Sequence, residues 1–281
     1  MGDTPSADKP LTDRLLRSWT RCRRRAWLDR HGDQSKRVYS AHRTLQLDDQ
    51  QRSFVALLPC KPGHGLAACE RGDVGVVGLR LRGQTPEGQR LEAHPALLQR
   101  QPGRSRWGDY SYRPVLARQG RRLTREHRLQ LALAARLLAL LQQAPVADGL
   151  ALAGAGRYLD KDTVALGENL QRQLDEALRK LALDLERPEP PPLASDRRKC
   201  SLCSWRGVCN AEAGRVGHLS EVSGIGAKRR EMLLELGIDG LHALADADPQ
   251  RLAEQLQRFG DQHGAVAVSY THLTLPTNVA V

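Results

Sequence analysis

The stretch RKCSLCSWRGVCN, residues 198–210, carries three cysteines in a C-x2-C-x5-C spacing within a short polar segment: Cys200, Cys203 and Cys209. Tetrahedral thiolate sites and iron–sulfur clusters both take four ligands, so a site built on this segment needs one more. The other cysteines of the chain are Cys22, Cys60 and Cys69. The choice among them decides which distant parts of the chain meet, and therefore the fold.

We predict that Cys22 is the fourth ligand. It lies in SWTRCRRRAWL, residues 18–28, where a basic amphipathic helix would hold the thiol rigidly beside arginines that favour a ligating thiolate. Cys60 and Cys69 flank the glycine-rich segment KPGHGLAA and are interpreted as ordinary small side chains. The spacing alone leaves an iron–sulfur cluster, a zinc ion and no metal as open alternatives.

The composition favours an anionic partner. Among 281 residues, 43 are Lys or Arg and 32 are Asp or Glu, which gives a formal charge of +11. Such a balance favours nucleic acid, although a solubilising surface would also explain it. No stretch reaches the ~20 apolar residues of a membrane span, and MGDTPSADKP lacks a signal-peptide core, so we expect a cytoplasmic protein with no membrane partner. In that reducing compartment the cysteines are better interpreted as metal ligands and bystanders than as disulfides.

The order of expected elements indicates an α/β fold. Hydrophobic spacing predicts helices over about 12–30, less clearly 43–58, 124–143 and from about 164 to 185. Alternation and turn residues predict strands over 75–83, 91–100, 110–118 and 149–156. Pro95 and Pro114 require edge or bulge positions, and RPEPPPLAS, residues 187–195, is expected to be a stiff linker.

Three features together resemble a known family: S-x3-C-x-R-x2-W-L near the start, the helix and strand order, and the late cysteine spacing. They are similar to RecB-like nucleases of the PD-(D/E)XK superfamily that carry an iron–sulfur cluster. The resemblance covers residues 11–210 and implies a restriction-endonuclease-like mixed sheet flanked by helices. It also implies that a structural 4Fe–4S cluster, with zinc as the alternative, joins the two ends of this domain through four thiolates: Cys22, Cys200, Cys203 and Cys209.

The catalytic positions depart from the family pattern. The family holds Mg²⁺ with an Asp on one strand and an Asp or Glu on the next, followed two residues later by a Lys. In RPVLARQ, residues 113–119, these last two positions hold Leu116 and Arg118. Leucine cannot ligate Mg²⁺, and arginine stays charged and is a poor proton acceptor. We therefore assign no catalytic residue and doubt that Mg²⁺ binds.

Two further family positions are also replaced. The upstream acid corresponds to Ala96, and the family's Gln-x3-Tyr becomes Gln130 and Ala134. The alternative is an active metal-dependent nuclease in which Glu92 and Asp109 have taken over as metal ligands. The simpler interpretation of both acids is solvated surface charge.

A second motif follows the cysteines. SGIGAKRREMLLELGI, residues 223–238, resembles the helix-hairpin-helix, which implies a small all-α domain over residues 216–260. Gly224 and Gly226 would allow a tight turn at a helix start, with Ile225 buried as its anchor. Contacts to DNA phosphates would come from the residues that follow: Lys228, Arg229 and Arg230. The alternative is that the motif packs against protein.

The last segment stands apart from the rest. AVAVSYTHLTLPTNVAV, residues 265–281, has no charged residue and resembles translated sequencing-adapter read-through, so we expect it to be non-native. His42 and His94 are open as site members or as structural or solvated residues. Taken together, the sequence predicts a DNA-binding, catalytically degenerate nuclease-like protein of repair or recombination. The alternatives are an active nuclease and a non-enzymatic scaffold for another repair or helicase protein.

Overall fold

The computed structural model describes residues 9–39, 52–54, 56–118, 122–155, 158–195 and 197–264. The chain divides into two compact units: unit 1 is Met1–Gly32 with Ala41–Pro191, and unit 2 is Asp33–Ser40 with Pro192–Val281. The division falls inside the expected proline linker. The expected domain of residues 11–210 thus draws on both units, whereas residues 216–260 lie within unit 2. His42 and residues 265–281 lie outside the described residues.

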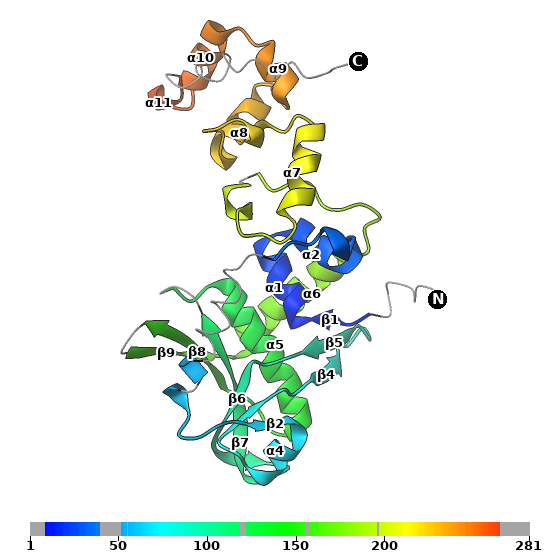
Figure 1. The fold of residues 1–281 in the computed structure, drawn as a ribbon, viewed down its shortest axis with the longest axis vertical. Coiled ribbons are helices and arrows are strands. Elements are labelled where there is room, and N and C mark those ends of the chain that lie inside the picture. The colour runs from blue at the N-terminus through cyan, green and yellow to red at the C-terminus, as the bar shows by residue number, and fades with distance from the viewer. Residues whose placement is uncertain are drawn as a thin grey trace. The chain divides into compact units, whose positions relative to one another are not determined.

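Unit 1 contains two sheets (Figure 1). The larger has the order β2-β3-β6-β7-β8-β9, and its strands are Gly63–His64, Gly75–Val77, Leu97–Ser105, Gly108–Arg118, Asp148–Ala155 and Tyr158–Ala165. The smaller has the order β1-β5-β4, and its strands are Leu11–Thr12, Arg90–Ala93 and Leu81–Gln84. Strands β7 and β8 are parallel, while β6 and β7 are antiparallel, so the larger sheet is mixed.

Helices cover these sheets. Helix α5 (Arg125–Gln142) forms the crossover between β7 and β8 and packs against both strands, and also against β4 and β5 of the smaller sheet. Helices α1 (Asp13–Arg21), α2 (Arg23–His31) and α6 (Glu168–Leu185) pack on one another beside α5 (Figure 1), while α4 (Gly65–Arg71) packs on β2 and β3. The α/β class and the mixed sheet flanked by helices are therefore confirmed.

Each face of the larger sheet has its own apolar core. Leu98, Tyr112 and Ala151 pack with the leucines of α5 and α6 on one face. On the other face, Leu97 and Val115 pack with Phe54 in a separate cluster. Of the expected helix over 43–58, only residues 52–54 and 56–58 are described, and residues 52–54 are helical.

The strand expected over 75–83 was wrong, because it is two strands in different sheets. Between β3 and β4, Gly78 has φ +69°, a left-handed conformation that glycine adopts without strain. A Cβ at this position would lie 2.1 Å from His64 Nε2, so no larger residue fits. This turn sends the chain from the larger sheet to the smaller one.

The strand expected over 91–100 is also divided. Strand β5 ends at Ala93 and β6 begins at Leu97, so Pro95 lies between them and needs no ladder partner. The strand expected over 110–118 is confirmed as β7. Pro114 pairs with Leu98 of β6 and directly precedes Val115, where the pairing of β7 with β8 begins, so its missing N–H interrupts no bond to β8.

The expected N-terminal helix is broken at Cys22. Thr12 caps α1, since its Oγ1 accepts a hydrogen bond from Leu15 N at 3.1 Å. Cys22 itself is extended, with φ −163° and ψ 119°, and separates α1 from α2. The Ser18 hydroxyl donates to Asp29 Oδ2 at 2.5 Å, which links the two helices. Cys22 therefore occupies a bend, and its expected place within a continuous helix was wrong.

The structure confirms the expected helix over 124–143 as α5 and the strand over 149–156 as β8. Strand β9 was not expected, and α6 begins at Glu168 rather than near residue 164. Strand β9 reads YLDKDTVA, in which charged residues interrupt the apolar pattern. It forms a hairpin with β8 and is the edge strand on that side of the larger sheet.

The described elements of unit 2 are all helical. They are three short 3-10 helices, Gln34–Lys36, Arg197–Cys200 and Leu219–Glu221, and α7 (Arg206–Arg215), α8 (Ala227–Glu235), α9 (Leu241–Ala245), α10 (Pro249–Gln257) and α11 (Asp261–Gly264). Ile225, Leu233, Leu244 and Leu252 share one apolar core. Across the described ranges, no helix has the length and apolar character to cross a membrane.

Candidate functional site

The site begins at the carboxyl end of β7, where the family pattern places a catalytic lysine and this chain has Arg118. The register of the sheet explains where its side chain goes: Arg118 pairs with Ala153 of β8, and Ala153 pairs with Asp160 of β9. Cross-strand partners share a face, and strands lie about 4.8 Å apart. The small side chain of Ala153 lets Arg118 reach over β8 to the next strand.

Arg118 ends between two carboxylates. Its Nη2 donates to Asp160 Oδ2 at 3.1 Å and to Asp162 Oδ2 at 2.7 Å. The Arg118 side chain is 1% exposed, whereas those of Asp160 and Asp162 are 63% and 41% exposed. Asp160 and Asp162 lie two residues apart on β9 and so face the same side of the sheet. The guanidinium is thus buried under a pair of carboxylates that solvent still reaches.

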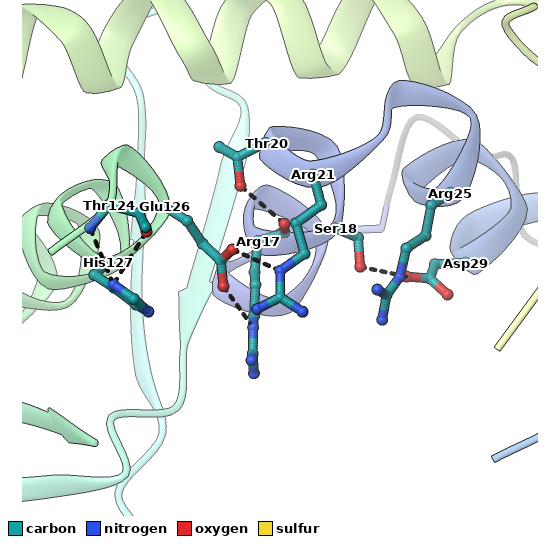
Figure 2. A network of polar contacts seen from close by, with 9 residues as sticks. All are labelled: Arg17, Ser18, Thr20, Arg21, Arg25, Asp29, Thr124, Glu126 and His127. Carbon is teal, nitrogen blue, oxygen red and sulfur yellow. Dashed lines mark hydrogen bonds and ion pairs between the residues drawn. The ribbon is translucent and has the colours of Figure 1, made fainter. Parts of the chain in front are cut away.

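A third carboxylate of the site comes from the first turn of α5 (Figure 2). Glu126 is 10% exposed and receives hydrogen bonds from two arginines of α1, Arg17 Nε at 2.9 Å and Arg21 Nε at 2.6 Å. Arg17 and Arg21 lie four residues apart, so one helix face presents both to the same acid. Figure 2 shows Glu126 lying between the two guanidinium groups. This contact fixes α1 against the start of α5.

His127 completes this region. The backbone N–H of Thr124 donates to His127 Nδ1 at 3.2 Å, which caps the start of α5 (Figure 2). Burial lowers the pKa of His127 below its ordinary value; the Glu126 carboxylate opposes this shift, and the charges of Arg17, Arg21 and Arg118 reinforce it. A buried imidazole held in this way stays neutral at pH 7.

The pKa of Glu126 reflects the same neighbours. Burial raises the pKa of this carboxyl, but the hydrogen bond from Arg21 and the charges of Arg21 and Arg17 outweigh burial. The net shift is below the ordinary value, so Glu126 is ionised at pH 7 and neutralises part of the arginine charge. The region therefore balances cations with carboxylates instead of gathering carboxylates around a metal.

The other expected catalytic positions hold no replacement chemistry. Leu116 packs against the core on the α5 face, and Ala96 packs on the opposite face. Gln130 is half-buried on α5, and Ala134 is buried four residues later. The positions that the family uses for metal and base are thus apolar or cationic in this chain.

The two alternative acids do not meet. Asp109 is exposed at the start of β7, nine residues before Arg118, which in a strand corresponds to about 30 Å. Glu92 lies on β5 of the smaller sheet, where its Oε2 accepts from Arg82 Nε at 3.3 Å. Its Oε1 is 3.3 Å from His94 Nε2, and His94 Nδ1 is 3.7 Å from Asp13 Oδ1. Glu92 and His94 therefore belong to an ion-pair cluster of the smaller sheet.

Sequence reasoning missed Asp160, Asp162 and Glu126. For the pair on β9, a usable signal was present: the glycines that end β8 precede the period-two acids of YLDKD, as in a hairpin with one polar face. Glu126 carries a different signal. An acid in the first turn of a predicted helix is most simply explained by the helix dipole, so its two arginine partners were not evident.

The expected ligand cysteines are distributed over both units. Cys22 lies in the bend between α1 and α2 of unit 1, and Cys200, Cys203 and Cys209 lie in unit 2. All four are half-buried, and none of them forms a disulfide. Among the residues that the structure describes, no group of three or more His, Cys, Asp or Glu side chains is arranged to hold a metal ion. The thiol chemistry suits a cluster or zinc, but the described geometry does not assemble the site, so the four-thiolate centre stays a prediction.

The late cysteines lie on an ordered segment. Cys203 N donates to Cys200 O at 2.9 Å, and Cys209 N donates to Trp205 O at 3.0 Å. Trp205 is 1% exposed, and Arg197 bonds to Glu221 and Asn210. By contrast, burial followed by the nearby Glu70 and Asp73 charges raises the pKa of the Cys69 thiol to about 11. Cys69 is therefore a protonated core side chain, as interpreted, and Cys60 is exposed.

The glycine turn of unit 2 has the local geometry expected of a hairpin. Gly224 has φ +89°, a left-handed conformation, and Ile225 is 5% exposed within the apolar core of unit 2. Gly226 is the N-cap of α8, and Lys228 is exposed in the first turn. Arg229 Nη1 donates to Gly224 O at 2.8 Å, which closes the turn, and Arg230 is half-buried. The element before the turn is the 3-10 helix Leu219–Glu221.

Comparisons with known proteins give little further information. No family model matches the chain, and no curated protein matches it. Among solved structures, one titled "Crystal structure of SSO0001" is similar at a TM-score of 0.46 and 10% identity, over 75% of this chain and 89% of that chain.

Proposed function

We propose that this chain is a DNA-binding, nuclease-like protein of cytoplasmic DNA repair or recombination, and that it does not cleave its substrate. In this proposal the mixed sheet of unit 1 is a degenerate restriction-endonuclease-like, RecB-type fold, and residues 216–260 form a helix-hairpin-helix. The formal charge of +11 supports an anionic partner.

The observation that carries DNA binding is the turn at Gly224, Ile225 and Gly226. The buried isoleucine fixes the turn to the core of unit 2, so the N–H groups that begin α8 and the exposed Lys228 are held on a rigid support. Backbone N–H groups at a helix start, together with a nearby cation, are suited to a phosphate and make no contact that depends on base sequence.

The absence of cleavage rests on Arg118. A permanently charged guanidinium bonded to Asp160 and Asp162 lies where a metal-bound acid and a lysine would have to act together. A divalent cation at this point would have to compete with the guanidinium for the two carboxylates. DNA binding without hydrolysis is the activity that these residues support best.

The test compares two double variants of unit 2 by fluorescence anisotropy with labelled duplex DNA over a range of salt concentrations. Lys228→Ala with Arg229→Ala removes the cations of the turn, and the matched control Arg251→Ala with Arg258→Ala removes two exposed cations of the α10 region. We expect the first pair to reduce the slope of log K against log salt by up to about 1.8, at about 0.9 for each phosphate contact. The control should leave the slope unchanged.

Equal slopes for both pairs would indicate that the turn packs against protein. No measurable DNA binding by the natural sequence would favour the scaffold alternative. Incubation with single-stranded and duplex DNA in Mg²⁺ or Mn²⁺ should give no products. Cleavage that disappears in Glu92→Ala or Asp109→Ala would contradict the inactive assignment.

The cluster is a separate part of the proposal. The resemblance supports a structural 4Fe–4S centre on Cys22, Cys200, Cys203 and Cys209, with zinc as the alternative. Anaerobic purification followed by iron and zinc analysis tests it, with Cys22→Ser expected to lose metal and Cys60→Ser as the matched control. Neither metal in the natural sequence would exclude this centre.

A further inference from the structure

A cavity of about 350 Å³ opens within unit 1, where the carboxyl ends of α2 and α6 meet the chain that leads into β1. Its volume lies at the lower end of the range of ligand-binding sites, about 300–1,000 Å³. The side chains that give it chemical character are Lys9, Trp27, Arg30, His31, Glu186 and Arg187. None of them belongs to the turn of unit 2 or to the Arg118 region.

The charges around this cavity are predominantly positive. Lys9, Arg30 and Arg187 carry permanent cations, while Glu186 is the acid among the lining residues. Lys9 and Arg187 are exposed, so their charges are open to solvent. Arg187 Nη1 lies 4.0 Å from Asp184 Oδ1, but that carboxylate also receives Arg23 and Trp19 Nε1. An anion in the cavity would therefore meet more positive than negative charge.

Arg30 gives the cavity a fixed cationic wall. Its two terminal nitrogens donate to the backbone oxygens of Lys9 at 3.1 Å and Pro10 at 2.7 Å. These bonds hold the guanidinium in place. Burial lowers the pKa of Arg30, as expected for a cation that has lost part of its hydration.

An aromatic pair lies beside these cations. The Trp27 and His31 rings have their centroids 4.8 Å apart and are tilted by 34°. Trp27 Nε1 donates to Arg187 O at 2.9 Å, and His31 Nε2 lies 2.8 Å from Leu185 O. Both rings are thus held by the carboxyl end of α6 and need no rearrangement to receive a ligand. Aromatic rings fixed beside cations suit a ligand that has both a flat base and a phosphate.

We propose that this cavity takes one nucleotide of a single DNA strand, with its base against Trp27 and its phosphate between Arg187 and Lys9. The inference rests on the proposed DNA binding and adds a second contact that recognises unpaired bases. A single strand is required because the bases of a duplex stack on one another and leave no face for Trp27. The protein would then contact duplex phosphates through unit 2 and an unpaired base through unit 1.

The first test is photo-crosslinking of the full chain to an oligo(dT) that contains 5-iodouracil, with mass-spectrometric mapping of the crosslinked peptide. We expect the peptide that contains Trp27 to be crosslinked. Unlabelled oligo(dT) should compete, and the mononucleotide dTMP should compete only at much higher concentration. Competition by dTMP at the same concentration would assign the cavity to free nucleotides and overturn the proposed strand contact.

The second test compares two single variants in binding to oligo(dT). Arg187→Ala removes a cation of the cavity, and Arg179→Ala removes an exposed cation of α6 that does not line it. We expect Arg187→Ala to reduce the salt slope by about 0.7, the value for one contact to a single strand, and Arg179→Ala to leave it unchanged.

A third variant tests the aromatic contact. Trp27→Ala should weaken binding to oligo(dT) by about tenfold, within the range for loss of one stacked base. Circular dichroism checks that the variants fold.

The outcomes separate this inference from the proposed function. If the natural sequence binds duplex DNA through Lys228 and Arg229, yet Arg187→Ala behaves like Arg179→Ala and no crosslink reaches Trp27, the nucleotide cavity is wrong and the proposed function stands. If the natural sequence binds neither duplex nor single-stranded DNA, both are wrong.

Discussion

Two basic regions of this protein use the same type of side chain in opposite ways. At the end of β7 in unit 1, Arg118 is 1% exposed and donates to Asp160 and Asp162. At the start of α8 in unit 2, the positive charge of Lys228 is on an exposed side chain. The positive charge is neutralised in the first region and remains available in the second.

The comparison shows why net charge alone does not locate a nucleic-acid site. Cations bonded to carboxylates contribute to the stability of the fold and attract a phosphate only weakly, because the nearby negative charge cancels much of their field. Cations bonded to neutral groups keep their field. The arginines of α1 belong to the first class, since Arg17 and Arg21 share Glu126.

The largest effect is expected from the anchor of the unit 2 turn. Ile225→Ala should reduce the free energy of unfolding of unit 2 by about 3 kcal/mol, because a buried isoleucine truncated to alanine leaves a cavity. Hydrogen exchange resolves this region from unit 1: amides of α8 and α10 should exchange faster, while those of β7 should be unaffected. DNA binding should weaken in parallel, since the N–H groups of the turn lose their support.

The control for Ile225 is Leu234→Ala on α8, the helix that follows the turn. Leu234 is 38% exposed, so its truncation should change exchange of α8 much less. Equal acceleration by both variants would show that the turn is not fixed by its isoleucine, and would remove the distinction between a rigid hairpin and an ordinary loop.

The next effect is expected from the carboxylates above Arg118. Asp160→Ala with Asp162→Ala removes two carboxylate partners of a buried guanidinium, and the loss of stability in urea unfolding should be about 2 kcal/mol. This is less than for a fully buried pair, because solvent reaches both acids and screens the interaction. The control Asp175→Ala removes the partner of Arg136 on the helix surface and should cost about 0.5 kcal/mol. Equal costs would mean that the Arg118 guanidinium is solvated and does not depend on these two carboxylates.

The sequence predicted those helices and strands in which the spacing of apolar residues repeats along the whole element. The leucine spacing of α5 and the alternation of β7 both recur over more than two turns or pleats, and Thr124 and Thr12 mark helix starts. The positions at which one strand ends and the next begins were less evident from the sequence. Gly78 and Pro95 were visible as residues, but whether each ends a strand depends on the sheet to which the next strand belongs.

The bend at Cys22 could not be predicted from its neighbours. No glycine or proline occurs between Asp13 and His31, and the apolar spacing continues through the bend. The bend is supported by the Ser18 to Asp29 hydrogen bond and by packing of both helices on α6. For the site, it was evident from the sequence that Arg118 stands where the resemblance implies a lysine. Its carboxylate partners were not, because they lie 42 and 44 residues further along the chain.

A smaller and pH-dependent effect is expected at Glu126. The pKa of this carboxyl is below its ordinary value in the folded protein, so its contribution to stability is complete above that value and is lost as the pH falls through the folded pKa. Glu126→Gln should therefore cost about 1 kcal/mol at pH 7 and progressively less as the pH falls from the ordinary value of the carboxyl through its lowered folded pKa, where the unsubstituted carboxyl also becomes protonated. Glu87→Gln, in an exposed turn, is the control and should show no such difference. A cost that is the same at pH 7 and pH 3 would mean that the arginines of α1 do not depend on the charge of Glu126.

The smallest effect tests the comparison directly through DNA binding. Lys228→Ala and Arg17→Ala each remove one positive charge from a side chain that is at least partly exposed. Lys228→Ala should reduce the salt slope for duplex DNA by about 0.9, because a cation that contacts phosphate releases counterions on binding. Arg17→Ala should change the slope much less, since its charge is paired with Glu126 and Arg21 remains to occupy that acid. Affinity measured by anisotropy at several salt concentrations gives both slopes. If the two variants lose the same slope, carboxylate pairing does not decide which cations of this protein contact DNA, and the α1 arginines would have to be counted as part of the binding surface.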